Sequence, residues 1–183
     1  MNKDVLRNQL KAIRKNIENK ADKDVLINSR ILEFIKNERD VLVYLSAYTE
    51  VETLNLCKIL LKNKVNVYAP KCIDDRTMIF CKVESLNQLK KSKYGIFEPI
   101  DNMKVLQKLE NPICLVPGLG FDLNGYRIGY GKAYYDTFLR KNKVKSVGVC
   151  YSEQIVNEIP KEKHDKQLEF LITDKFTKEI FNG

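Results

Sequence analysis

The sequence predicts a single-domain α/β protein with a mostly parallel sheet and helices on both faces. Short apolar runs of strand length alternate along the chain with segments of helical periodicity, and Pro and Gly separate many of them. The length of 183 residues, with 44% hydrophobic and 31% charged residues, suits one domain with its own core. We therefore expect one unit over residues 1–183, in which helices within residues 1–38 pack on an α/β core of residues 40–176.

Two helices are predicted before the first strand, over residues 3–17 and about 24–36. The first has an apolar stripe at helical spacing, made of Leu6, Leu10, Ile13 and Ile17. A basic stripe lies about a quarter turn away and contains Lys3, Arg7, Lys11 and Arg14. A basic stripe is by itself typical of a solvent-exposed face, and this is what we expect for Lys11 and Arg14.

The following elements predict a Rossmann-like βαβ unit. An apolar strand over 41–46 precedes a helical stretch over 50–62 and a strand over 65–69, which Pro70 is expected to stop. Further strands are predicted near residues 78–83, 113–116, 146–150 and 171–173, with a short helix near 85–90 and a helix over 134–139. The carboxyl ends of parallel strands meet at one edge of a sheet. We therefore expect Glu50, Lys71 and the glycine-rich segment after residue 116 to open onto the same rim.

The net charge limits the classes of function. The chain has 32 Lys and Arg against 24 Asp and Glu, so its formal net charge is +8. The main alternative to an enzyme is therefore a basic nucleic-acid-binding α/β domain. The lysines, however, are interleaved with acids, and no helix-turn-helix, zinc-finger or RNA-recognition signature is present. Because anionic small substrates suit the charge equally well, we predict no nucleic-acid partner.

The cysteines and the hydropathy pattern predict a cytoplasmic protein. The five cysteines form no Cys-x-x-Cys pair and only one histidine is present to join them in a metal site, so we expect reduced thiols that are mostly core residues. No apolar run reaches the roughly 18 residues that a membrane span needs. We expect a soluble, unexported monomer that does not interact with membranes.

The most informative segment is the glycine loop, which we define as residues 117–133. Its glycines permit positive φ and close approach of a ligand, and it leads into a helix whose N-terminal amides suit a phosphate. A P-loop is excluded, because Gly125 precedes Gly131-Lys132 by five residues and Ala133 lacks a hydroxyl. The dinucleotide fingerprint would need a glycine at position 134, where a tyrosine stands. Cations in the loop and a carboxylate one turn later favour a nucleoside triphosphate with its metal ion.

At this point a family resemblance becomes clear. The run Pro117-Gly118-x-Gly120-Phe121-Asp122-x-x-Gly125-Tyr126-Arg127-x-Gly129-Tyr130-Gly131-x-x-Tyr134-Tyr135-Asp136 resembles the signature of the 5-formyltetrahydrofolate cyclo-ligases, also called methenyltetrahydrofolate synthetases. Other motifs of that family occur in the same order: Lys3 and Arg7, Glu50-Val51-Glu52-Thr53, Gly95-Ile96-Phe97-Glu98-Pro99, and His164-Asp165. The resemblance extends from residue 3 to about residue 173, nearly the whole chain.

The resemblance implies an ATP-dependent C–N ligase of the cyclo-ligase class. The implied reaction converts 5-formyltetrahydrofolate to 5,10-methenyltetrahydrofolate with release of ADP and phosphate, through a phosphorylated formyl group. A relative that kept the fold and the ATP site but lost folate turnover is a further alternative. The implied cofactor is Mg²⁺, which accompanies ATP as co-substrate.

The resemblance also implies roles for individual residues. The catalytic residues would be Arg127, Lys132 and Tyr134. ATP would contact Lys3, Arg7, Arg127, Ile128, Gly129, Tyr130, Gly131, Lys132, Ala133, Tyr134 and Tyr135. The folate would contact Leu45, Glu50, Tyr94, Tyr130, Gly131, Lys132, Ala133 and Tyr134. The metal ligands would be Asp136 and Asp165.

Patterns alone leave other roles open for some of these residues. Glu50 could be a carboxylate at a helix N-terminus, and Tyr134 and Tyr135 could be partly core residues. His164 is expected to position Asp165 rather than act as a base.

Two departures from the family pattern carry expectations of their own. Ala133 stands where relatives usually have glycine. Because a β-carbon is penalised at positive φ, we expect Ala133 at negative φ, in or beside the first turn of the helix that follows. The run Lys166-Gln167-Leu168-Glu169 is more polar than the family norm, which leaves its docking open.

Overall fold

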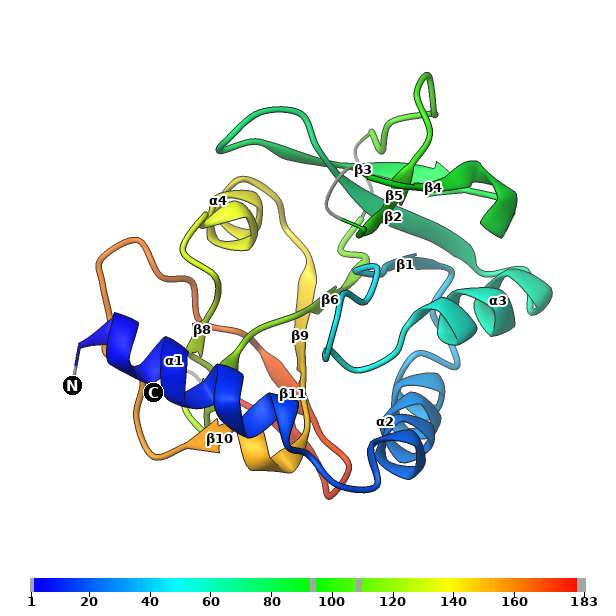
Figure 1. The fold of residues 1–183 in the computed structure, drawn as a ribbon. Helices are drawn as coiled ribbons and strands as arrows, with labels where there is room; N and C mark the ends of the chain where they lie inside the picture. The colour runs from blue at the N-terminus through cyan, green and yellow to red at the C-terminus, as the bar shows by residue number, and fades with distance from the viewer. Residues whose placement is uncertain (1, 93–94, 108–109, 181–183) are drawn as a thin grey trace.

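The computed structural model describes residues 2–92, 95–107 and 110–180. Within these residues the main sheet has seven strands in the order β12-β11-β9-β6-β1-β2-β3 (Figure 1). The strands are β1 (Asp40–Leu42), β2 (Asn66–Cys72), β3 (Met78–Val83), β6 (Ile113–Val116), β9 (Lys145–Val149), β11 (Phe170–Ile172) and β12 (Thr177–Glu179). The five inner strands run parallel, and only the edge strands β3 and β12 are antiparallel to their neighbours. The predicted mostly parallel α/β sheet is confirmed.

Helices cover both faces of this sheet, as expected from strands that alternate their side chains between the faces. In β6, Ile113 and Leu115 pack in one core with residues of α2 (Lys20–Phe34) and α3 (Leu54–Lys62). The intervening Cys114 and Val116 pack in a second core with α4 (Tyr134–Lys141). Figure 1 shows α4 on the side of the sheet opposite α2 and α3. The βαβ unit predicted early in the chain is β1-α3-β2.

The N-terminal helix α1 (Lys3–Lys15) packs against a smaller sheet that the sequence did not predict. This sheet has the order β10-β7-β8, with β7 (Gly120–Asp122), β8 (Arg127–Ile128) and β10 (Ile155–Val156). Leu6 and Leu10 are buried here, whereas Ile13 is 41% exposed, so only part of the predicted stripe is core. A β-carbon on Gly120 would lie 2.5 Å from Leu10 Cδ1, so the missing side chain lets the helix approach the sheet closely.

Strand β2 is longer than predicted because it passes through Pro70. The pairing of β1 with β2 ends at Tyr68, and beyond that residue no described strand forms a ladder on that side of β2. Proline is tolerated at such an edge because its missing N–H has no ladder bond to make. Pro70 remains in register with Phe80 of β3, and the antiparallel ladder continues to Cys72.

The segment between β3 and β6 contains little of the predicted short helix. Among the described residues of this segment, only Leu86–Gln88 are helical, as a 3₁₀ turn (η1) with a capping box from Ser85. A two-stranded hairpin of β4 (Leu89–Lys91) and β5 (Phe97–Pro99) follows. A second 3₁₀ turn, η2 (Ser152–Gln154), precedes β10. In the described part of the chain, none of the helices has the length and apolar character that crossing a membrane requires.

Candidate active site

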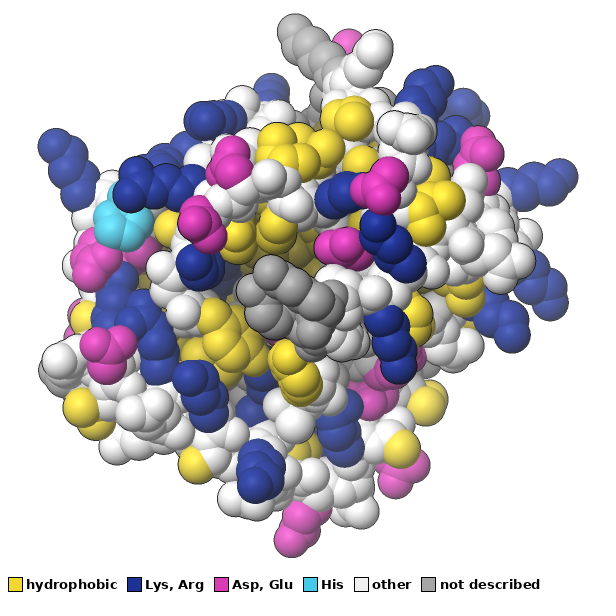
Figure 2. Space-filling model, turned by 45° about the horizontal axis from the view of Figure 1, so that its top comes forward, with side chains coloured by type: hydrophobic (Ala, Val, Ile, Leu, Met, Phe, Trp, Pro, Cys, Tyr) yellow, Lys and Arg dark blue, Asp and Glu magenta, His cyan; other side chains and the backbone are white. Residues whose placement is uncertain are grey.

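A cavity of about 1100 Å³ opens between α1, the turn after β1, strands β2 and β3, and the glycine loop. Figure 2 shows the hollow with hydrophobic side chains inside and charged side chains at its rim. Every described residue that the sequence placed at a binding or metal site lines it: Lys3, Arg7, Leu45, Glu50, Arg127, Ile128, Gly129, Tyr130, Gly131, Lys132, Ala133, Tyr134, Tyr135, Asp136 and Asp165. Tyr94 lies outside the described residues. The fold thus gathers segments from four parts of the chain around one cavity.

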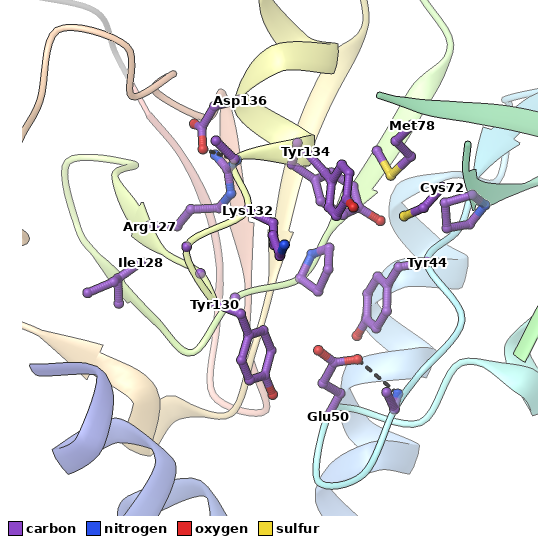
Figure 3. A pocket seen from close by; sticks show the side chains of 18 of the residues that line it. Tyr44, Glu50, Cys72, Met78, Arg127, Ile128, Tyr130, Lys132, Tyr134 and Asp136 are labelled. Carbon is purple, nitrogen blue, oxygen red and sulfur yellow. Dashed lines mark hydrogen bonds and ion pairs between the residues drawn. The ribbon is translucent and has the colours of Figure 1, made fainter. Parts of the chain in front are cut away.

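Glu50 supplies a buried carboxylate on one wall. It ends the short turn that follows β1, and only 11% of its side chain is exposed. Its Oε2 accepts a hydrogen bond from the Ala47 N–H at 2.9 Å, and its Oε1 lies 3.8 Å from Arg14 Nη1. Burial raises the pKa of this carboxyl, against the lowering effects of the Ala47 amide and the Arg14 charge. Figure 3 shows the Tyr44 and Glu50 side chains pointing toward one another in the cavity.

The alternative role for Glu50, capping the next helix, belongs to its neighbour Glu52. Glu52 accepts from the backbone N–H groups of Leu54 and Asn55, the first residues of α3. These are the amides that a helix leaves unsatisfied at its N-terminus. Glu50 is therefore left to face the cavity.

On the opposite wall, Arg127 and Asp136 form a nearly buried ion pair. Arg127 is 8% exposed, and its Nη2 lies 3.0 Å from Asp136 Oδ2. The same guanidinium donates to the Lys166 carbonyl at 3.3 Å, while Asp136 Oδ1 accepts the Lys166 N–H at 3.0 Å. These contacts dock the polar run that begins at Lys166, and Leu168 within it is buried. Both carboxylate oxygens of Asp136 therefore already have partners.

The end of the glycine loop contradicts the expectation for Ala133. Its φ is +53° and its ψ is 20°, which is left-handed backbone, and it is the N-cap of α4 rather than part of the first turn. The Ala133 carbonyl accepts the Thr137 N–H at 2.9 Å, so the helix begins after it. Gly131, two residues earlier, has φ +97°. The prediction of negative φ was wrong because the geometry that leads the loop into α4 outweighs the local penalty on a β-carbon.

Lys132 and the tyrosines beside it differ in their environments. Lys132 is largely exposed, with its Nζ 3.3 Å from Asp75 Oδ1. The Tyr134 hydroxyl donates to the Asp74 carbonyl at 3.0 Å. The Tyr135 hydroxyl is buried without a hydrogen-bond partner among the described residues, and burial raises its pKa well above the usual value. Tyr134 and Tyr135 also pack against the buried core residues on their side of the sheet, so their expected core role is met together with a place in the cavity.

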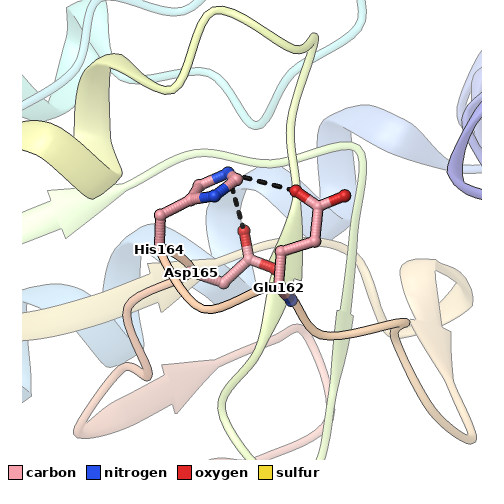
Figure 4. A group of neighbouring side chains, drawn as sticks. All are labelled: Glu162, His164 and Asp165. Carbon is pink, nitrogen blue, oxygen red and sulfur yellow. Dashed lines mark hydrogen bonds and ion pairs between the residues drawn. The ribbon is translucent and has the colours of Figure 1, made fainter.

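A group of acidic and imidazole side chains stands beside the N-terminus of α1. Lys3 Nζ lies 2.8 Å from Asp165 Oδ2 and 3.2 Å from Glu162 Oε2. His164 Nε2 lies 3.1 Å from Glu162 Oε2 and 3.8 Å from Asp165 Oδ1. One ligand atom from each of Glu162, His164 and Asp165 falls within 4.8 Å of the others (Figure 4). Asp136 is not a member of this group, and the sequence missed Glu162 although it is an acid on the same loop.

The second basic residue of the N-terminal motif contacts the glycine loop directly. Arg7 Nε donates to the Gly129 carbonyl at 3.0 Å, and Arg7 also pairs with Asp4 on its own helix. Lys3 and Arg7 thus both line the cavity from α1, and their contact with ATP stays a prediction.

Two expectations about basic residues were wrong. Arg14 is 3% exposed rather than solvated, although Lys11 on the same stripe is exposed as predicted. Lys71 does not line the cavity, although its neighbours in β2, Pro70 and Cys72, do. Alternate strand residues point to opposite faces, so Lys71 instead pairs with Asp101 at 2.7 Å.

The cysteines agree with the expectation of unpaired thiols. All five are free, and Cys57, Cys81, Cys114 and Cys150 are buried. Cys72 is the exception, since it is exposed and lines the cavity beside Met78 of β3 (Figure 3). The alternation of β2 and β3 side chains would have pointed to both residues if the two strands had been placed in register.

Comparison with known proteins identifies the family. The model of the 5-formyltetrahydrofolate cyclo-ligase family matches residues 1–174. A probable 5-formyltetrahydrofolate cyclo-ligase of Schizosaccharomyces pombe is 34% identical over 143 residues, covering 68% of this chain and 69% of the relative. The 5-formyltetrahydrofolate cyclo-ligase of Saccharomyces cerevisiae is 28% identical, covering 93% of this chain and 94% of the relative.

Solved structures agree with this result. The NMR structure of Aquifex aeolicus 5,10-methenyltetrahydrofolate synthetase has a TM-score of 0.84 at 29% identity, covering 100% of this chain and 95% of that one. A 5,10-methenyltetrahydrofolate synthetase from Mycoplasma pneumoniae has a TM-score of 0.77 at 25% identity, covering 95% and 99%. With the family motifs gathered around one cavity, the chain belongs to the 5-formyltetrahydrofolate cyclo-ligase family.

Proposed function

We propose that the protein catalyses the ATP-dependent cyclisation of 5-formyltetrahydrofolate to 5,10-methenyltetrahydrofolate, with release of ADP and phosphate. The observation that carries this proposal is a single cavity with two chemically different walls. One wall presents the buried Glu50 carboxylate, and the other presents Arg127, Lys132 and the backbone of the glycine loop. A volume of about 1100 Å³ exceeds what one drug-sized ligand needs and suits two ligands held face to face.

The chemical difficulty is that an amide-like formyl oxygen is a poor leaving group. The formyl oxygen forms a bond to the γ-phosphorus of ATP as the bond to the bridging oxygen breaks and ADP leaves. N10 then attacks the activated formyl carbon, the C–O bond breaks with loss of phosphate, and the N10 proton passes to solvent. The protein has to align the two ligands and neutralise the phosphate charge, which are the main contributions to phosphoryl transfer.

The ATP phosphates lie against the glycine loop in this proposal. Arg127 binds phosphate oxygens through its planar fork and Lys132 acts as a point charge, with Tyr134 beside them at the reacting groups. Lys132 supports this role because it is exposed in the cavity and its Asp75 partner is itself 91% exposed, a pairing that a phosphate can replace at little cost. The other proposed ATP contacts are Lys3, Arg7, Ile128, Gly129, Tyr130, Gly131, Ala133 and Tyr135.

The folate lies against the wall that carries Glu50. The pterin has a donor-rich edge, and a buried carboxylate is a strong acceptor for such donors. Glu50 suits this role because, among the residues that the structure describes, only one of its oxygens has a short hydrogen bond, to the Ala47 amide. Leu45 supplies apolar surface, and the proposed folate contacts that line the cavity further include Tyr130, Gly131, Lys132, Ala133 and Tyr134. Tyr94, which lies outside the described residues, is proposed as a folate contact from the family resemblance alone.

The metal ion that accompanies ATP is proposed to be Mg²⁺, held by Asp165 with Glu162. Carboxylate oxygens are the ligands that Mg²⁺ prefers, and these two side chains already bring oxygen atoms together beside the ATP wall. Lys3 Nζ pairs with both carboxylates in the structure, so Mg²⁺ would have to replace this ammonium contact. When bound, Mg²⁺ neutralises charge on the phosphates. Asp136 is a proposed ligand through water, since its own oxygens are engaged by Arg127 and Lys166. His164 contacts Glu162 and Asp165 and orients them.

We further propose a cytoplasmic, monomeric enzyme. The five free cysteines support a reducing compartment, although a relative from Arabidopsis thaliana is named as mitochondrial. The family relationship argues against the nucleic-acid-binding alternative. In the proposal, the basic residues that line the cavity bind the phosphates of ATP instead of a nucleic-acid backbone.

A direct assay tests the function. The protein is mixed with MgATP and 5-formyltetrahydrofolate, and the ultraviolet absorbance of the methenyl product is followed, with the omission of ATP as control. Product formation that depends on ATP supports the proposal. ATP binding in calorimetry without any product would instead favour a family member that has lost folate turnover, and an absence of binding to either substrate would contradict the proposal.

A further inference from the structure

We propose that Arg14 is a positioning residue that holds the two substrate walls of the cavity in one geometry. This inference rests on the proposed function and adds a residue that the family motifs did not single out. Arg14 comes from the last turn of α1, is 3% exposed, and is not among the residues that line the cavity. It is therefore placed to act through its neighbours rather than by touching a substrate.

The guanidinium of Arg14 joins three separate segments. Its Nε donates to Thr49 Oγ1 at 2.8 Å, in the turn that carries Glu50. Its Nη1 donates to the Gly118 carbonyl at 3.3 Å, where the chain leaves β6. Its Nη2 donates to the Tyr130 hydroxyl, and its central carbon lies 5.6 Å from the centre of that ring. We name this group of contacts the Arg14 clamp.

The clamp connects the turn that carries the proposed folate-binding residue Glu50 with the loop segment proposed to bind ATP, in which Tyr130 is a proposed contact of both ligands. Thr49 immediately precedes Glu50, whose carboxylate lies 3.8 Å from Arg14 Nη1 and is proposed to bind the pterin. Tyr130 lies between Gly129 and Gly131 in the segment proposed to bind ATP. Because the planar guanidinium has a fixed fork of donors, it sets the direction of both segments at once, which a lysine ammonium would not do.

The burial of Arg14 also indicates a specific purpose. Removing a guanidinium from water is costly unless its donors are satisfied, and surface arginines on amphipathic helices normally avoid this cost. Lys11 and Lys15, on either side of Arg14 in the sequence, remain exposed. Leu6 and Leu10 form the apolar contact of α1 with the smaller sheet, and Arg14 adds to it buried polar contacts with three other segments.

The test compares four single variants with the wild type, Arg14→Met, Arg14→Lys, Thr49→Val and Lys15→Met, together with the double variant that combines Arg14→Met and Thr49→Val. Arg14→Met removes the clamp, and Thr49→Val removes only its contact with the Glu50 turn while Arg14 stays in place. Lys15→Met is the matched control, because it makes the same kind of change at an exposed position of the same helix. Initial rates are measured well below the unfolding temperature of each variant, and the Kd values for the folate and for a non-hydrolysable MgATP analogue are measured separately by calorimetry.

Arg14→Met should raise the KM and Kd for both substrates by about tenfold, the loss expected when a charge-assisted hydrogen bond no longer orients a binding group. Thr49→Val should raise the folate values alone, and adding it to Arg14→Met should have no further effect on them. Arg14→Lys should recover little, because it keeps the charge but not the fork. Lys15→Met should behave as the wild type.

Other outcomes would overturn the proposal. If Arg14→Met lowers the unfolding temperature but leaves both Kd values unchanged, Arg14 is a structural residue only. If only one substrate is affected by Arg14→Met, the clamp does not serve both walls. A wild type that binds both ligands without turnover would refute the proposed function while the Kd values still decide the role of Arg14. A wild type that binds neither would refute both.

Discussion

Replacing Ala133 by glycine tests the backbone of the proposed ATP loop where it departs most from the family pattern. Ala133 has φ +53°, a region that costs a residue with a β-carbon about 1–2 kcal/mol and costs glycine nothing. Glycine also has more conformational freedom than alanine in the unfolded chain, which offsets about 0.4–1 kcal/mol of the stability gained by removing the β-carbon. The free energy of unfolding of Ala133→Gly should therefore rise by about 0.5–1 kcal/mol, which raises Tm by about 1–4 °C in a chain of this size.

The assay is thermal and urea unfolding of matched variants without ligands. Ala12→Gly is the control, because Ala12 is exposed within α1 and glycine there should lower the free energy of unfolding by about 1 kcal/mol. The two alanine-to-glycine changes are thus expected to have opposite signs. The KM for MgATP of Ala133→Gly should stay within about twofold of the wild type, since glycine adopts the same conformation. If Ala133→Gly loses stability as Ala12→Gly does, Ala133 is not at positive φ.

Three further predictions concern the cavity. Glu50→Gln should raise the folate KM about tenfold and leave that of MgATP within about threefold, whereas Glu52→Gln should weaken the cap of α3 without a folate effect. Because burial raises the folded pKa of Glu50, the stability linked to this group is present at low pH and lost as the pH rises through that pKa. Glu50→Gln should therefore gain stability relative to the wild type as the pH rises above the ordinary glutamate pKa, and a difference in urea unfolding that does not change with pH would contradict this. Arg127→Ala should lower kcat/KM for MgATP by about a hundredfold or more, and near-normal steady-state rates would refute its phosphate role. Asp165→Asn should raise the Mg²⁺ concentration for half-maximal activity more than Asp136→Asn does, and the reverse order in a magnesium titration would move the metal to Asp136.

The strands and helices with strong periodicity were predictable because their signals are local. Ile113–Val116 and Met78–Val83 match the predicted strands residue for residue. The short strands β7, β8 and β10 were missed because two or three residues carry no period, and their pairing depends on segments distant in the sequence. Pro70 was misread as a strand end because its tolerance depends on where the neighbouring strand stops.

The candidate site divides in the same way. The glycine loop was found because its residue types and spacing carry chemistry by themselves. The roles of Lys3, Arg7 and Glu50 were assigned only through the family resemblance, since their patterns alone also fit a solvent-exposed face and a helix N-terminus. The burial and the partners of each side chain could not be predicted from residue types and spacing. Arg14 and Lys11 lie on one helical stripe and look alike in the sequence, yet only Arg14 meets Thr49 and Tyr130 from other elements and is buried.

The sequence by itself therefore determined the α/β class, the family and the segments that form the cavity, because periodicity, turn residues and motif spacing are properties of neighbouring residues. Only the tertiary structure decided which charges are buried and which backbone is strained. Asp136 pairs with Arg127, Glu162 lies beside Asp165, and Ala133 adopts positive φ. Each of these features depends on contacts or turns that segments distant in the sequence impose. The burial of a side chain and its ion pairs depend on every group packed around it, and the spacing of residues along the sequence does not specify those groups.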